Sequence, residues 1–94
     1  ATVPEVITSL EGKWLIDTYT IPEDDGAFYN IELKQDLIRK QEEQYMSADP
    51  AFKALARILV RQGIGEKIIY RGDKSGKTVE IVFTPEEIST LINK

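Results

Sequence analysis

The chain has 94 residues, of which 41% are hydrophobic and 30% are charged, and its net charge is −4. This length is enough for one folded domain, residues 1–94, with a single core, and the composition is typical of a soluble protein. Cysteine and histidine are both absent. Their absence excludes disulfides, thiol nucleophiles, zinc sites built from Cys and His, and a Ser-His-Asp triad within the chain.

Location and membrane contact follow from the same composition. No apolar run approaches the roughly 20 residues that a membrane-spanning helix needs, so we expect no contact with a membrane. Small secreted domains usually depend on disulfides. A chain without cysteine therefore favours a cytoplasmic or organellar location.

The first predicted element is a short helix over residues 3–11. Thr2 and Glu5 have the spacing of a capping box, in which each side chain accepts a hydrogen bond from the other residue's backbone amide. The apolar residues of this segment recur at helical spacing. They are Val3, Val6, Ile7 and Leu10. Gly12 is a typical residue to end such a helix.

A hairpin is predicted to follow, with strands over residues 13–20 and 27–33. Both segments are rich in aromatic and β-branched residues, which favour strands. Pro22 and the pair Asp25-Gly26 indicate the turn between them.

Two helices are predicted in the middle of the chain. From residue 33 to residue 45, apolar residues recur at helical spacing between charged ones. Asp49 and Pro50 are typical of a new helix start, and Gly63-Ile64 predicts a Schellman ending. The buried stripe of this second helix consists of Phe52, Leu55, Ala56 and Leu59.

The last third of the sequence predicts a hairpin of residues 66–72 and 77–84. A four-residue loop, 73–76, would pair Tyr70 with Val79 and would set the next apolar pair on the same face. A three-residue loop with a bulge at Gly76 is the alternative, and the apolar pattern favours the first. Thr84-Pro85 then begins a terminal helix, with Glu87 completing a capping box.

These elements predict an α+β fold. Two β-hairpins form a small, mostly antiparallel sheet that packs against a central helical pair, and short helices lie at the N-terminal and C-terminal ends.

Charge is divided unevenly along this sequence. The first 33 residues carry seven acidic residues and one basic residue, whereas residues 53–77 carry seven basic residues and two acidic ones. The acidic surface is expected at Glu23, Asp24 and Asp25. The basic candidates are Lys53, Arg57, Arg61, Arg71, Lys74 and Lys77. The two groups could complement each other internally or form two opposite surfaces.

The leading hypothesis is a non-catalytic protein-interaction domain, such as a subunit, adaptor or inhibitor. Its partner would be another protein or a second copy, bound through charge-complementary surfaces or an exposed sheet edge. No catalytic residues are expected, because the sequence offers no nucleophile-and-base arrangement and no glycine-rich phosphate loop.

Two other classes of function stay open. Lys53, Arg57 and Arg61 recur every four residues and, with Lys74 and Lys77 at a hairpin tip, could contact nucleic-acid phosphates. The aromatic residues of the first hairpin could instead line a site for a small apolar ligand. These aromatic residues are Trp14, Tyr19, Phe28 and Tyr29.

No metal or cofactor is expected. The acidic loop has carboxylates that suit Ca²⁺ or Mg²⁺, but it lacks the ligand spacing of an EF-hand. The Asp25-Gly26 pair is explained by the turn alone.

Overall fold

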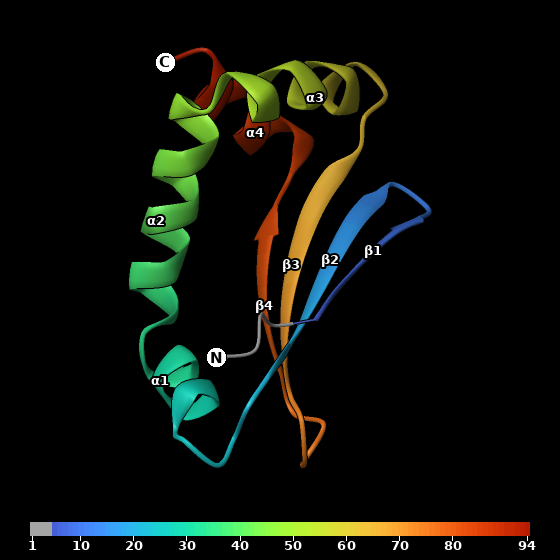
Figure 1. Cartoon of the computed structure of the whole chain (residues 1–94). Coiled ribbons are helices and arrows are strands. Elements are labelled where there is room, and N and C mark those ends of the chain that lie inside the picture. Colours follow the sequence, from blue (N-terminus) through green and yellow to red (C-terminus); the bar gives the residue numbers. More distant parts are fainter. Residues whose placement is uncertain (1–4) are drawn as a thin grey trace.

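In the part of the chain that the structure describes, four strands form one sheet and four helices pack against it (Figure 1). The computed structural model describes residues 5–94. In chain order the elements are β1 (Val6–Glu11), β2 (Trp14–Ile21), α1 (Ala27–Leu33), α2 (Gln35–Ala48), α3 (Pro50–Arg61), β3 (Gly65–Gly72), β4 (Thr78–Phe83) and α4 (Pro85–Ile92). The predicted α+β class is confirmed.

The sheet follows the order β1-β2-β3-β4 and is mixed. Each outer pair is an antiparallel hairpin, β1 with β2 and β3 with β4. The central pair, β2 with β3, is parallel. A parallel pair needs a long crossover, and α1, α2 and α3 supply it.

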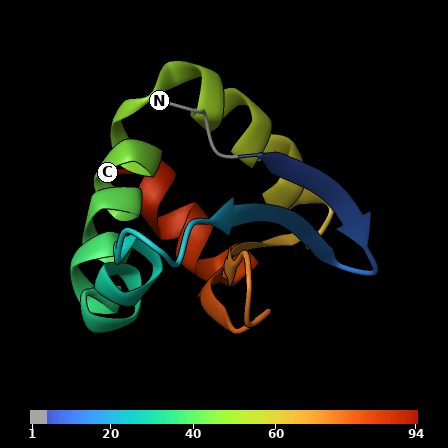
Figure 2. The ribbon, with the colours of Figure 1, turned by 60° about the horizontal axis from the view of Figure 1, so that its bottom comes forward.

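The core lies between the helices and the half of the sheet made by β3 and β4. Ile68, Ile81 and Phe83 point from the sheet toward α4, where Ile88 and Leu91 are buried. β1 and β2 extend beyond the helices, as the view along the strands shows (Figure 2). One side of the sheet is therefore covered over β3 and β4 and more open over β1 and β2.

The β3–β4 hairpin has the predicted register. Tyr70 lies opposite Val79, and Ile68 lies opposite Ile81. The four-residue loop is closed by a hydrogen bond from the Gly72 amide to the Lys77 carbonyl. Gly76 has a φ of +74°, a left-handed conformation that costs glycine little.

The predicted start and end of α3 and the predicted start of α4 are also confirmed. Asp49 accepts hydrogen bonds from two amides at the start of α3. The Ile64 amide donates to the Leu59 carbonyl and the Gly63 amide to the Val60 carbonyl, which is the Schellman pattern. At α4, Thr84 and Glu87 form the predicted capping box.

The predicted N-terminal helix is wrong. Residues 6–11 form β1, which pairs with β2 from Val6 opposite Tyr19 to Glu11 opposite Trp14. The apolar spacing is compatible with a helix, but pairing with β2 satisfies the backbone of the segment and decides its structure. Gly12 occupies the turn between the two strands with a φ of +59°. The predicted cap at Thr2 lies outside the described residues.

The predicted strand over residues 27–33 is also wrong, because this segment forms α1. The Ala27 amide donates to Asp25 Oδ1 just before the helix, and Gly26 is the N-cap residue. Phe28 then packs with Ile21 and Val79 in a second buried cluster. Burial of one helical side of the segment outweighs the strand preference of its residues. The first hairpin is thus β1–β2.

No helix in the described part of the chain has the length and apolar character needed to span a membrane.

Candidate functional site: an acidic groove between the sheet and two helices

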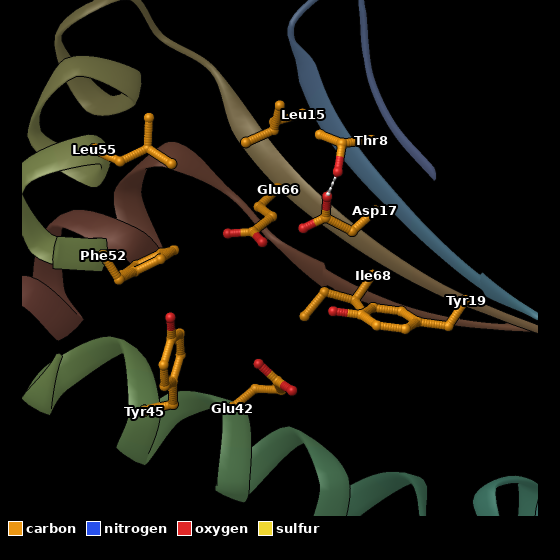
Figure 3. Close-up of a pocket in the computed structure, with 10 residues that line it drawn as sticks. All are labelled: Thr8, Leu15, Asp17, Tyr19, Glu42, Tyr45, Phe52, Leu55, Glu66 and Ile68. Carbon is orange, nitrogen blue, oxygen red and sulfur yellow. Dashed lines mark hydrogen bonds between the residues drawn. The ribbon is translucent and has the colours of Figure 1, made fainter. Parts of the chain in front are cut away.

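A groove of about 510 Å³ lies between β1, β2 and β3 on one side and α2 and α3 on the other (Figure 3). It forms where the helices stop covering the sheet. Leu15, Ile68, Phe52 and Leu55 supply its apolar lining. The groove combines this apolar lining with several acidic and aromatic side chains.

Three carboxyl groups face the groove from three different elements. Asp17 comes from β2, Glu66 from β3 and Glu42 from α2. Strand register places Leu15 beside Glu66 and Asp17 beside Ile68. Asp17 and Glu66 therefore project from neighbouring strands onto the same face of the sheet.

Within residues 5–94, Glu66 is the one charged residue that is buried, and its exposed fraction is 6%. No hydrogen-bond donor of residues 5–94 reaches its Oε2 atom. The neighbouring Asp17 differs, because its Oδ1 atom accepts a 2.7 Å hydrogen bond from the Thr8 hydroxyl of β1. A buried carboxylate without donors is unfavourable and is a site where a bound group can supply the missing contact.

The pKa of Glu66 is raised to about 7, chiefly by burial and to a smaller extent by the nearby carboxyl groups of Asp17 and Glu42. A protonated Glu66 can also donate a hydrogen bond to Asp17, which favours its neutral form. The pKa of Glu42 is raised too, first by burial and then by the charge of Asp17. The groove therefore holds a proton close to neutral pH.

Aromatic rings form part of the groove wall. Tyr45 of α2 and Phe52 of α3 have ring centroids 5.8 Å apart. Tyr19 of β2 stacks on Tyr70 at 5.6 Å, and burial is the main cause that raises the pKa of both phenols. The electron-rich faces of such rings attract cations as the carboxylates do.

This arrangement suits binding of a positively charged or proton-donating group. Among residues 5–94, none that lines the groove is a lysine or an arginine. Within residues 5–94, no group of three or more acidic side chains is placed to hold a metal ion. A carboxyl pair of this kind can also serve acid–base catalysis.

Comparison with known proteins shows the fold alone. No family model and no curated protein sequence matches the chain. A crystal structure of a "putative secreted protein" from Pseudomonas aeruginosa is similar, with a TM-score of 0.67 and 15% sequence identity. The similarity covers 86% of this chain and 67% of the other. The two chains share a fold.

The structure separates the basic residues that the nucleic-acid hypothesis combines. Lys53, Arg57 and Arg61 lie on α3, at one end of the molecule. The β3–β4 loop, with Lys74, lies at the opposite end (Figure 1). The two groups therefore do not form one continuous basic surface.

The predicted acidic loop and the basic hairpin tip contact each other. Glu23 Oε2 accepts hydrogen bonds of 2.6 Å from the backbone amides of Lys74 and Ser75. These bonds lower the pKa of Glu23. The Lys74 ammonium forms an ion pair with Asp24 at 2.6 Å. The acidic loop and the basic hairpin tip therefore compensate each other's charge within the molecule.

The remaining predicted residues are dispersed. Asp25 accepts a hydrogen bond from the Ala27 amide in the turn before α1, and Arg71 and Lys77 are exposed on either side of the β3–β4 loop. The groove does not gather the aromatic residues either. Trp14 lies on the opposite sheet face, across Gly65 and under the Lys67 ammonium, whose nitrogen is 4.7 Å from the ring centroid.

Sequence reasoning missed the three groove carboxylates. They are about 25 residues apart along the chain, and nothing in the local pattern connects them. One signal was available: Glu66 occupies an inward position of β3, alternating with Ile68 and Tyr70. An acidic residue on an otherwise apolar strand face indicates a buried charge.

Proposed function

We propose that this chain is a non-catalytic protein-interaction domain, and that its partner binds in the acidic groove between β1–β3 and α2–α3. The observation that carries the proposal is Glu66, a buried residue that lines the groove and whose Oε2 atom has no hydrogen-bond donor among residues 5–94. Native proteins seldom keep such a group without a role.

The edges of the groove support the same proposal. Val6 and Leu10 project from β1 on the groove side and are exposed, as is Leu55 of α3. β1 is also an edge strand, whose outer backbone groups have no neighbouring strand in the sheet. Apolar rims and unpaired strand edges are common features of surfaces that bind a protein segment.

The proposal is tested by site-specific photo-crosslinking. A photoreactive amino acid replaces Leu55, which lines the groove, and in a matched control it replaces Ile58, which is exposed on α3 outside the groove. We expect a protein adduct at position 55 and none at position 58. The cross-linked protein is identified, and its affinity for the purified chain is then measured.

Two point variants then locate the binding surface. Leu55→Arg should weaken binding of the identified protein at least tenfold, and Ile58→Arg should leave it unchanged. Adducts of equal yield at both positions, or binding that is insensitive to Leu55→Arg, would contradict the proposal. Thermal unfolding of both variants checks that each is folded.

A further inference from the structure

The chemistry of the groove indicates what the partner must insert. Asp17, Glu42 and Glu66 converge from three elements, and in the described part of the chain no lysine or arginine lines the space between them. Repulsion between these carboxylates and the desolvation of Glu66 are relieved by any cation that enters. A complementary positive charge is thus the group that this site lacks.

The walls select an organic cation with an apolar stem. Phe52, Leu55 and Leu15 offer carbon surface beside the carboxyl groups. Tyr45 adds an aromatic ring next to Phe52. Lysine and arginine side chains match this pairing, since each carries a charged head on a hydrocarbon stem. A bare metal ion does not need such walls, and residues 5–94 contain no set of three or more acidic groups arranged to hold one.

We propose that the groove receives the ammonium or guanidinium group of a lysine or arginine side chain of the partner protein, with Glu66 as its buried counter-ion. This inference rests on the proposed function and specifies the group that is recognised. Asp17 and Glu42 complete the negative charge around the inserted head. The Thr8 hydroxyl, which donates to Asp17, holds that carboxylate in place.

Proton release accompanies this binding. The titratable groups that face Glu66 are Asp17 and Tyr19 from β2 and Glu42 and Tyr45 from α2. Helix α3 contributes the uncharged Phe52 and Leu55. A cation binds only the ionised form of Glu66, whose pKa is about 7. Binding should therefore weaken about tenfold when the pH is lowered from 8 to 6, as the ionised fraction falls.

The first test uses n-butylammonium, which reproduces the end of a lysine side chain, and 1-butanol as its neutral counterpart. Binding is followed by NMR titration of the backbone amides at Asp17, Glu42 and Glu66. We expect saturable shifts with the amine and none with the alcohol. Glu66→Gln should weaken amine binding at pH 8 about tenfold or more and should remove the pH dependence.

Matched controls separate this site from general attraction to an acidic protein. Glu43 is adjacent to Glu42 in α2 but lies outside the groove, so Glu43→Gln should leave amine binding unchanged. Equal weakening by Glu43→Gln and Glu66→Gln would overturn the inference. Displacement of the amine by an equal concentration of MgCl₂ or CaCl₂ at constant ionic strength would also overturn it.

The second test identifies the source of the cation. Blocked tripeptides Gly-X-Gly with X as lysine, arginine or norleucine are titrated in the same way. Shifts with the lysine or arginine peptide, but not with norleucine, support a protein side chain. Binding of butylammonium without binding of either cationic peptide would indicate a free amine and would contradict the inference.

The third test distinguishes this inference from the proposed function. Photo-crosslinking at position 55 is repeated in the Glu66→Gln background. Loss of the adduct supports both proposals. An undiminished adduct refutes the cation inference and leaves the groove as a protein-binding site, whereas absence of any adduct in the unaltered background refutes the proposed function.

Discussion

Glu66 and Asp17 project from two parallel strands onto one face of the sheet and share the floor of the groove. Thr8 holds Asp17 by a hydrogen bond, whereas no donor reaches Glu66 Oε2. The two acids therefore have different chemistry despite their proximity. Asp17 has a hydrogen-bond donor in Thr8, whereas burial raises the pKa of Glu66 to about 7.

This relationship predicts an unusual pH dependence of stability. The pKa of Glu66 rises from 4.5 to about 7 on folding, so the folded chain binds this proton more tightly than the unfolded chain. Its contribution to stability is complete below pH 4.5 and is lost as the pH rises through about 7. The full effect is about 3 kcal/mol at most.

Glu66→Gln should remove this effect, because the amide is neutral at every pH. Urea unfolding at pH 5 and pH 8 provides the measurement, and Glu43→Gln serves as the control for charge. We expect the free energy of unfolding of the unaltered chain to fall toward pH 8, and that of Glu66→Gln to fall much less. An equal decrease in the unaltered chain and in Glu66→Gln would show that Glu66 ionises normally in the folded chain.

A second prediction concerns Glu23 and the β3–β4 loop. Its carboxylate accepts from the amides of Lys74 and Ser75, and these bonds lower its pKa. Glu23→Gln should accelerate hydrogen exchange at these two amides, since a neutral acceptor binds them more weakly. Glu32→Gln, on α1, is the control. In the unaltered chain the protection should be lost as the pH falls through the lowered pKa.

The capping box of α4 gives a third prediction. Thr84 accepts from the Glu87 amide, and Glu87 accepts from the Thr84 amide. Thr84→Ala should lower the free energy of unfolding by about 1 kcal/mol, as measured by urea unfolding. Thr90→Ala, at an exposed position within the same helix, should have little effect. Equal losses in both variants would argue against a specific cap.

A fourth prediction compares adjacent residues of α3. Leu59 is buried, whereas Ile58 is 55% exposed. Leu59→Ala should cost about 2–5 kcal/mol through the cavity that it leaves, and Ile58→Ala should cost about 0.5 kcal/mol or less. Denaturant unfolding measures both. A large loss in Ile58→Ala would indicate that the exposed side of α3 is covered in solution, for example by a second copy.

The elements predicted correctly are those with strong local signals. Asp49-Pro50 and Thr84-Pro85 place acceptors and proline where a helix begins, and Gly76 allows the left-handed turn of the last hairpin. Each of these signals depends on a few neighbouring residues, so it can be recognised from the sequence alone. The register of β3 with β4 followed from the turn and the apolar alternation together.

The strand predicted over residues 13–20 is confirmed as β2, but the elements predicted on either side of it were wrong because distant contacts determine them. Val6 and Leu10 fit a helical spacing, but β2 provides a strand partner. Phe28 lies in a segment that favours a strand, but its burial against Ile21 and Val79 requires α1. The groove was missed for the same reason, since its carboxylates meet only after the crossover places β3 beside β2.

The most direct test of the cation-binding groove is a measurement of the pKa of Glu66 by carbon-13 NMR of its side-chain carboxyl group. The account predicts a pKa of about 7 in the chain alone and a clear decrease with n-butylammonium, but none with 1-butanol. A pKa near the ordinary value of 4.5 in the chain alone, or one that the amine does not change, would contradict it.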